Sequence, residues 1–328
     1  MTGLVDQFGR QHRDLRVSIT DRCSLRCWYC LPVAPKAWLP KASLLTPIEI
    51  QRLVGIARTL GIERVRLTGG EALVRPDLVE IVRRIAALPD PPELALTTNG
   101  IGLAKLAQPL AEAGLRRVNV SLDSLDRATY ALITGRDCLP QALGGLEAAV
   151  LAGLHPVKIN AVLMPEVNDH EGLALLDFAI KQGYELRFIE QMPLDSAGAW
   201  HRSRMVSADD IHQSLTRHHH LTRLPDQGHA PATRWLVDGG PAVVGFIAAI
   251  TEPFCKACDR LRLTADGALR SCLFAHQEVD LRTPLRQGAS DDDIASMIVE
   301  AVANKPRGHQ IGNDDFVQPV RVMSAIGG

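Results

Sequence analysis

The residues of this chain whose spacing indicates chemistry are its cysteines. Six of the seven cysteines fall into two groups of three, one near each end of the chain: Cys23, Cys27 and Cys30, and then Cys255, Cys258 and Cys272. A [4Fe–4S] cluster usually takes four cysteines, so three thiolates would hold three irons and leave the fourth open to a substrate or cofactor. The spacing therefore predicts an iron–sulfur protein with two clusters of three cysteine ligands each.

Zinc is the alternative at both groups. Structural zinc takes four ligands, and no histidine lies within the first cysteine loop. At the second group His276 could complete a Cys3His site. The residues after Cys258 favour the cluster there, because Arg260 and Arg262 alternate on one face of a predicted strand. Structural zinc has no use for two arginines, whereas an open iron beside them could bind a nitrogen-rich, polyanionic ligand.

The elements that must position these cysteines alternate between strand and helix. The predicted strands are 15–20, 64–68, 93–98, 117–122, 157–163 and 185–190, and the predicted helices between them are 49–60, 76–87, 103–113, 141–152 and 171–182. This order predicts a parallel sheet with helices outside, which a doubly wound sheet and a partial (β/α)6 TIM-like barrel both satisfy. We expect the barrel, because conspicuous residues follow successive strands, where barrel enzymes place their sites.

The pattern changes after about residue 193. Loops are expected at 195–204 and 226–231, a helix at 206–216, a strand at 242–250 and a hairpin at 260–271 around Asp266-Gly267. We therefore expect two domains of an α/β protein. The barrel would span residues 1–229, and a small C-terminal α+β module with the second cysteine group would span residues 230–328.

Composition limits the classes of partner. Apolar residues make up 46% and charged residues 22%, which is typical of globular proteins with a sizeable core. The net charge of −1 and the absence of a polybasic tract argue against a nucleic-acid partner. The sequence has neither a secretory signal nor 18 consecutive apolar residues, so we expect no membrane partner and a cytoplasmic location with reduced cysteines.

The first cysteine group resembles the signature of the radical S-adenosylmethionine (SAM) superfamily, including the aromatic Tyr29 before the last cysteine. The segment Thr68-Gly69-Gly70-Glu71 is similar to the GGE motif of that superfamily, although alone it would be an ordinary turn. Ala72 stands where proline is commoner, which should alter the rigidity of the turn rather than the chemistry. The resemblance implies that SAM is bound by Tyr29, Gly70, Glu71, Ser121 and Met192.

The second cysteine group indicates a narrower family. The pattern F-C-x-x-C-D-R-x-R-L-x-x-D-G from Phe254, followed by S-C-L-F, resembles the GTP 3′,8-cyclase family, also called molybdenum cofactor biosynthesis protein A. Further similar segments are 15–23, 97–100, 120–126 and 187–190, and the chain ends in Gly-Gly as members of that family do. The resemblance covers essentially the whole chain.

The resemblance implies a radical SAM lyase that converts GTP to (8S)-3′,8-cyclo-7,8-dihydroguanosine 5′-triphosphate, the first step of molybdenum cofactor (molybdopterin) biosynthesis. The first cluster would reduce SAM to give a 5′-deoxyadenosyl radical, which takes the 3′ hydrogen of GTP so that C3′ attacks C8. The second cluster would bind guanine through its open iron. The partners implied are an electron donor such as flavodoxin or ferredoxin, a downstream cyclic pyranopterin monophosphate synthase, and a second copy of the chain in a homodimer.

The resemblance also assigns further site residues. Those implied to bind GTP are Arg16, Arg66, Thr97, Lys158, Arg187, Arg260, Leu261 and Arg262, and those implied to be catalytic, by entering the active site, are Gly327 and Gly328. The residues alone leave alternatives open. Arg16, Arg66 and Lys158 could form internal salt bridges, since buried charges are rarely unpaired. Met192 could be core, and a terminal Gly-Gly is usually a frayed end.

Two other functions compete with this interpretation. Peptide-modifying radical enzymes also carry auxiliary clusters, but they typically have more downstream cysteines and lack the paired Arg260 and Arg262. A zinc-binding adaptor with two structural sites is the non-enzymatic alternative. Of the remaining conspicuous residues, Cys138 is expected to be an ordinary thiol and His218-His219-His220 a surface loop.

Overall fold

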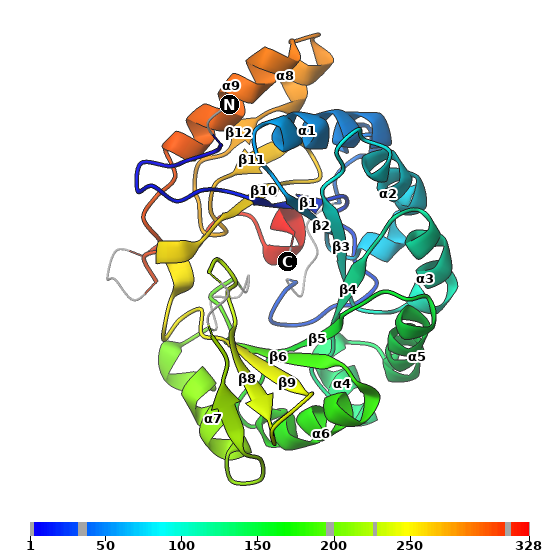
Figure 1. The fold of residues 1–328 in the computed structure, drawn as a ribbon, viewed down its shortest axis with the longest axis vertical. Coiled ribbons are helices and arrows are strands. Elements are labelled where there is room, and N and C mark those ends of the chain that lie inside the picture. The colour runs from blue at the N-terminus through cyan, green and yellow to red at the C-terminus, as the bar shows by residue number, and fades with distance from the viewer. Residues whose placement is uncertain (1–2, 32–37, 195–199, 226–227, 312–315, 328) are drawn as a thin grey trace.

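The computed structural model describes residues 3–31, 38–194, 200–225, 228–311 and 316–327. Within these ranges a 12-stranded sheet curls into an open barrel (Figure 1). Its centre consists of parallel neighbours in chain order: β1 (Asp14–Ser18), β2 (Arg64–Thr68), β3 (Glu93–Thr98), β4 (Arg117–Ser121), β5 (Val157–Ala161) and β6 (Glu185–Ile189). The predicted partial barrel is confirmed.

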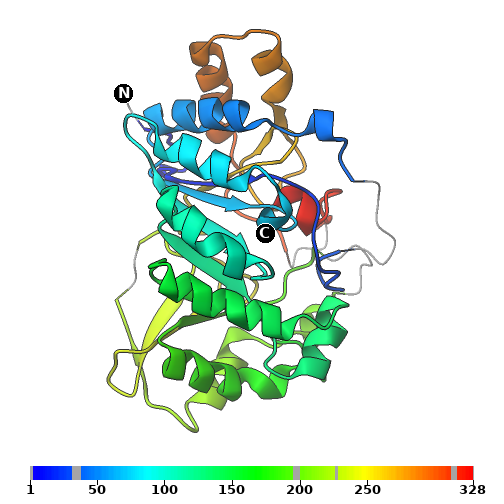
Figure 2. The same cartoon turned by 90° about the vertical axis from the view of Figure 1, so that its right-hand side faces the viewer.

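Helices cover the outer face of this sheet (Figure 2). They are α1 (Pro47–Thr59), α2 (Leu78–Ala86), α3 (Leu103–Glu112), α4 (Arg127–Thr134), α5 (Leu139–Leu151) and α6 (Gly172–Gln182). At the start of α1 the side chain of Thr46 accepts a hydrogen bond from the N–H of Glu49. The Glu49 carboxylate in turn accepts a hydrogen bond from the N–H of Thr46. This capping box fixes where α1 begins.

The chain after β6 extends both edges of the sheet. Beside β6 lie β9 (Val243–Ile247), β8 (Thr233–Val237) and β7 (Leu221–Arg223), and beside β1 lie β10 (Arg260–Leu263), β11 (Ala268–Arg270) and β12 (Val279–Asp280). The hairpin of β10 and β11 was predicted, whereas β7 and β8 were not. These strands continue the barrel sheet and do not form a separate one. The domain boundary expected after residue 229 therefore stays a prediction.

Four further helices complete the described part of the chain: α7 (Ala208–Leu215), α8 (Arg282–Arg286), α9 (Asp291–Ala303) and α10 (Met323–Ile326). Figure 1 shows α10 within the ring of strands, close to the C-terminal end of the described chain. No helix in the described ranges has the length and hydropathy needed to span a membrane.

The two faces of the sheet differ in polarity. Outward-facing strand residues are apolar and fully buried under the helices, as Val17, Leu67 and Leu96 illustrate. The alternate residues on the inner face are largely polar, for example Arg16 and Arg66 on β1 and β2. A TIM barrel normally fills its interior with branched apolar side chains. This barrel instead surrounds a cavity of about 640 Å³.

Candidate active site

The cavity inside the barrel brings most of the predicted site residues together. Those that line it are Arg16, Cys23, Cys27, Tyr29, Cys30, Arg66, Gly70, Glu71, Thr97, Ser121, Lys158, Arg187, Met192, Arg260 and Arg262. Cys258 and Cys272 lie beside it, since their chain neighbours Asp259 and Leu273 line the cavity. Gly328 lies outside the described residues.

The first cysteine group sits on the loop that leaves β1. A turn in which Cys30 N–H donates to Cys27 O (2.9 Å) brings these two residues together. Burial, and after it the charge of neighbouring Cys23, raise the pKa of Cys30 to about 12, because closely spaced thiolates repel. A cation among the three thiols would remove that repulsion and deprotonate them.

The donor set suits a cluster better than a single ion. Among the described residues no three His, Cys, Asp or Glu side chains converge on the position of one metal ion. A [4Fe–4S] cluster places each thiolate on a different iron, so its ligands need not converge on one point. Cys23, Cys27 and Cys30 are half-buried, line one cavity and therefore fit such a group.

The Gly-Gly-Glu turn packs directly against the backbone that precedes the first cysteine. Gly70 N–H donates to Thr20 O (2.8 Å) and Glu71 N–H donates to Arg22 O (2.7 Å). A Cβ on Gly70 would lie 2.4 Å from Arg22 O, a distance that no side chain tolerates. The glycine is thus required for this close approach, which joins the end of β2 to the loop of Cys23.

The Glu71 carboxylate is held at the edge of the cavity by the neighbouring strand. It accepts hydrogen bonds from Thr98 Oγ1 (2.7 Å), Asn99 N–H (2.6 Å) and Leu73 N–H (2.9 Å). Burial raises the pKa of Glu71, and the donated hydrogen bonds oppose that rise. The side chain is therefore oriented before any ligand binds.

Two residues that the sequence analysis did not single out also shape this end of the cavity. Asn99 Nδ2 donates to Ser24 Oγ (3.0 Å) and approaches Cys23 Sγ (4.0 Å). The Tyr29 hydroxyl donates to Asp123 Oδ2 (2.6 Å), which fastens the cysteine loop to the end of β4. Both lie within segments that resemble family motifs, and that position is the one signal by which they could have been found.

Cationic side chains from three adjacent strands form the opposite part of the site. In the strand register Arg262 on β10 lies opposite Arg16 on β1, which lies opposite Arg66 on β2. Arg260 is also on β10 and faces the same cavity. Burial, and after it the charge of Arg260, lower the pKa of Arg16 to about 10. Several arginine side chains are therefore crowded together on this wall of the cavity.

These arginines have hydrogen-bonding capacity to spare. The Nε atoms of Arg16 and Arg66 and one terminal nitrogen of Arg260 are buried without a hydrogen-bond partner among the described residues. Asp14, the carboxylate whose charge acts on Arg16 and Arg66, is at ion-pair distance from Arg64 instead (3.6 Å). Buried cations with unused donors require an anion, so this part of the cavity is suited to a polyanionic ligand.

The cations on β5 and β6 are arranged differently. Lys158 and Arg187 both form ion pairs with Glu185, and a terminal nitrogen of Arg187 lies 2.7 Å from Glu185 Oε1. Burial, and after it the charge of Arg187, lower the pKa of Lys158 to about 8. The salt bridge considered for Lys158 is thus present, although two cations share one carboxylate and both line the cavity.

In the second cysteine group, Cys255 and Cys258 lie between β9 and β10, and Cys272 follows β11. Cys255 and Cys258 flank a short turn in which Cys258 N–H donates to Cys255 O (3.3 Å). The charges of Cys272 and Cys258 raise the pKa of Cys255 after burial does, so the three thiols are neighbours. His276, the candidate fourth zinc ligand, is exposed. This group also fits a cluster with one open iron.

Leu261 and Gly327 complete the predicted site residues. The side chain of Leu261 is buried in the outer apolar core, so only its main chain is available to a ligand in the barrel. Gly327 lies inside the barrel, where its carbonyl oxygen accepts a hydrogen bond from Arg262. Its φ of 91° is the left-handed conformation that favours glycine.

A parallel barrel with a CxxxCxxC loop after its first strand and a Gly-Gly-Glu turn after its second defines a radical SAM protein. Residues 17–179 match the radical SAM superfamily, and residues 184–311 match the family described as Molybdenum Cofactor Synthesis C. The structure of SuiB from Streptococcus suis bound to S-adenosylmethionine is similar in fold, with a TM-score of 0.59, 13% identity and coverage of 87% of this chain and 68% of that one.

Relatives make the assignment more particular. The chain is 56% identical to a GTP 3′,8-cyclase of Streptomyces coelicolor, over 99% of this chain and 96% of that protein. It is 54% identical to a GTP 3′,8-cyclase of Mycolicibacterium smegmatis, over 99% and 92% respectively. The chain belongs to the GTP 3′,8-cyclase family. Its match to the radical SAM superfamily carries with it one [4Fe–4S] cluster and SAM.

Proposed function

We propose that this chain converts GTP to (8S)-3′,8-cyclo-7,8-dihydroguanosine 5′-triphosphate as the first step of molybdenum cofactor biosynthesis. Its relatives and the two family matches support this function. One observation in the site carries the argument: Arg16, Arg66 and Arg260 line the cavity, and each has a buried nitrogen that lacks a hydrogen-bond partner among the described residues. An anion as highly charged as a triphosphate satisfies those donors.

At the SAM end of the cavity, Cys23, Cys27 and Cys30 hold the first cluster. When bound, this cluster supplies the electron that breaks the sulfonium bond of SAM. Glu71 accepts three hydrogen bonds from the chain, and a carboxylate offers about four acceptor positions. One position therefore remains for the ammonium group of the methionine moiety. Tyr29, Gly70, Ser121 and Met192 complete the SAM site, which their place in the same cavity supports.

At the GTP end, the arginines of β10, β1 and β2 bind the triphosphate and guanine. Arg260 and Arg262 reach the ligand from β10, with the main chain of Leu261 between them. Lys158 and Arg187 face the same space from β5 and β6 while sharing Glu185, so one positive charge of that group is available to the ligand. Thr97 lines the cavity on β3 and adds a neutral contact.

Cys255, Cys258 and Cys272 would hold a second [4Fe–4S] cluster, which would supply an open coordination position for guanine. The proximity of the three thiols and their position next to Arg260 support this assignment. The terminal glycines take part in catalysis from inside the barrel, and the position of Gly327 beside Arg262 supports that role. The barrel then orients SAM and GTP together and keeps water from the reacting atoms.

The cellular setting follows from the same function. The enzyme acts in the cytoplasm, receives electrons from a protein such as flavodoxin or ferredoxin, and passes its product to a cyclic pyranopterin monophosphate synthase. It acts as a homodimer, with a barrel at residues 1–229 and a C-terminal module at residues 230–328.

The test is anaerobic reconstitution followed by incubation with SAM, dithionite and GTP, and mass analysis of the nucleotide and of 5′-deoxyadenosine. A cyclised nucleotide isomeric with GTP, formed with 5′-deoxyadenosine, is expected. A matched reaction with ATP should give no cyclised nucleotide, because it lacks the guanine groups that the second cluster binds. Cleavage of SAM by fully loaded protein without any change in GTP would contradict the proposal.

A further inference from the structure

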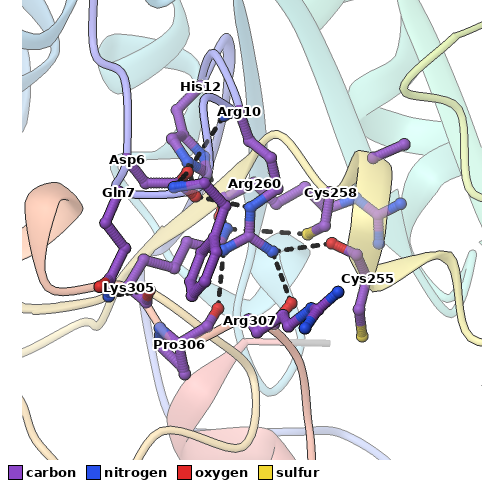
Figure 3. Close-up of polar contacts among 12 residues, drawn as sticks. Asp6, Gln7, Arg10, His12, Cys255, Cys258, Arg260, Lys305, Pro306 and Arg307 are labelled. Atoms are coloured by element: carbon purple, nitrogen blue, oxygen red, sulfur yellow. Dashed lines mark hydrogen bonds and ion pairs between the residues drawn. The ribbon is translucent and has the colours of Figure 1, made fainter.

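A buried lysine lies against the second cysteine group (Figure 3). Lys305 is 2% exposed, and its ammonium group meets three acceptors: Arg260 O at 2.7 Å, His12 Nδ1 at 3.4 Å and Cys258 Sγ at 3.7 Å. An ammonium group has three protons, so each contact can use one of them. The sulfur of Cys258 therefore receives a charged donor.

The lysine is held in place by a chain of polar contacts from the N-terminal segment. Since Lys305 can only donate, His12 Nδ1 accepts and His12 Nε2 carries the proton, which it donates to Asp6 Oδ2 (3.1 Å). The same Asp6 oxygen accepts from Arg10 Nε (2.6 Å). The alternation of positive and negative groups stabilises each of these buried charges.

Arg10 also fixes the two segments that surround the cysteines. Its terminal nitrogens donate to Cys255 O (2.7 Å), Pro306 O (2.7 Å) and Arg307 O (2.8 Å), as Figure 3 shows. One residue further on, a Cβ on Gly308 would lie 2.9 Å from Cys255 Cβ. The segment of residues 305–309 is therefore packed tightly around this cysteine turn.

The two cysteine groups thus differ in the donors that reach their sulfurs. Cys23 Sγ accepts from a neutral main-chain N–H of Leu25 (3.4 Å) and has the neutral amide of Asn99 nearby. Cys258 Sγ faces an ammonium group. Hydrogen bonds to sulfur and the net charge around a cluster set its reduction potential, and a nearby positive charge favours the reduced, more negative state.

We propose that Lys305 is a positioning residue for the second cluster, whose hydrogen bond to Cys258 raises the reduction potential of that cluster. Asp6, His12 and Arg10 hold the lysine in position. The inference rests on the proposed function, because it requires a cluster at Cys255, Cys258 and Cys272. It assigns to the N-terminal segment a part in the chemistry of residues near the other end of the chain.

The test is a redox titration of the reconstituted full chain, followed by electron paramagnetic resonance, with the unmodified chain and Lys305→Met compared. Hydrogen bonds to charged groups contribute about ten- to a hundredfold in an equilibrium constant. We therefore expect the one-electron potential of the second cluster to fall by about 60 to 120 mV in Lys305→Met. The first cluster, whose potential should not move, serves as the internal control.

Two further variants make the result specific. Lys256→Met removes an exposed lysine within the same cysteine turn. The reduction potential of the second cluster in this variant should match that of the unmodified chain, because solvent screens the charge of Lys256. Lys305→Gln keeps a polar side chain but loses the charge, and should shift the potential in the same direction even if Lys305→Met fails to fold. An unchanged potential in either Lys305 variant that holds both clusters would overturn the inference.

Iron content separates this inference from the proposed function. If the unmodified chain binds only about four irons per chain after reconstitution, the second cluster itself is refuted. If it binds about eight, the cluster is present and the potentials decide the role of Lys305 alone.

Discussion

Arg262 donates a hydrogen bond to the main-chain oxygen of Gly327, so the end of the described chain lies among the arginines inside the barrel. The segment that leads there is also anchored. Arg321 forms a two-pronged contact with Asp266 (3.0 and 2.9 Å) and a further one with Glu278 (2.9 Å). After it, Ile326 is fully buried. These contacts describe a docked tail rather than a frayed end.

Shortening this tail should stop the cyclisation of GTP while leaving the cleavage of SAM intact. Deletion of Gly327 and Gly328 is expected to leave iron content, SAM cleavage and GTP affinity nearly unchanged and to abolish or severely reduce the cyclised product. Gly327→Ala should have a similar effect, since its Cβ would lie 2.8 Å from Thr68 Cγ2 at a φ unsuited to alanine. The ratio of cyclised nucleotide to 5′-deoxyadenosine is the measurement, and full cyclisation in both variants would show the glycines to be dispensable.

Arg321, which anchors the tail, should also be needed for cyclisation more than for SAM cleavage. Arg321→Met removes the contacts with Asp266 and Glu278, so the tail should leave the barrel more often and the ratio of product to 5′-deoxyadenosine should fall several-fold. Arg321→Lys keeps the charge and should retain part of that ratio. Equal loss of SAM cleavage and cyclisation in Arg321→Met would indicate general damage to the fold instead.

Removing an unpaired arginine should weaken GTP binding without weakening the fold. Arg16→Met and Arg66→Met should each lower GTP affinity by about ten- to a hundredfold, the usual contribution of a hydrogen bond to a charged group. Without GTP their melting temperatures should match or exceed that of the unmodified chain, because each substitution removes a charge that has a buried Nε and no ion pair within the described part of the chain. A lower melting temperature with unchanged GTP affinity would instead support the salt-bridge interpretation of these arginines.

The first cysteine group should account for half of the bound iron. Replacing Cys23, Cys27 and Cys30 by alanine is expected to reduce the iron content from about eight to about four per chain and to abolish SAM cleavage. Cys138→Ala is the matched control, because Cys138 lies at the start of α5 and should leave both quantities unchanged. Stoichiometric zinc in the triple variant would show that the second site is not a cluster.

His219 should make stability depend on pH. It lies between Asp238 (2.7 Å) and Asp177 (3.0 Å), and the hydrogen bond to Asp238 raises its pKa. Protonated His219 binds both carboxylates, so its contribution to stability is complete below the unfolded pKa of about 6.5 and is lost as pH rises through the raised folded pKa.

The corresponding experiment compares melting temperatures of the unmodified chain and His219→Gln under anaerobic conditions. The difference between them should be larger at pH 6 than at pH 9. A difference independent of pH would mean that the imidazole stabilises the fold without its charge. Neighbouring His218 is exposed, so His218→Gln should show no such dependence.

The central strands could be predicted from the sequence because local patterns determine them. The strands at 64–68 and 93–98 have the predicted bounds, since apolar runs there end at turn-forming residues. Helix α4 was not predicted, because its two turns depend on the cap from Asp126 and on packing. The pairing of β10 with β1 was not predictable either, since neither strand specifies its neighbour.

The same distinction holds for the site. The cysteines and Gly70 could be found from their spacing along the chain. Asp123 could be found only through the resemblance of its segment to a family motif, because its contact with Tyr29 joins residues far apart in sequence. Lys305 could not be found, because its importance comes from Cys258, which lies far from it in sequence and next to it in space. That Arg16 would face inward was predictable from its strand. Its lack of an ion pair among the residues that the structure describes was not, because it depends on Asp14 being at ion-pair distance from Arg64 instead.

The position of β1 between β2 and β10 has a consequence for biosynthesis. Asp14 is synthesised well before Arg260, its partner in register, because the whole of the barrel between β1 and β10 lies between them in the chain. During that interval one edge of β1 has no partner, and an open strand edge invites pairing with other chains. Nascent chains that stall before β10 should therefore depend on chaperones, and the row of Arg262, Arg16 and Arg66 can form only after β10 has been made.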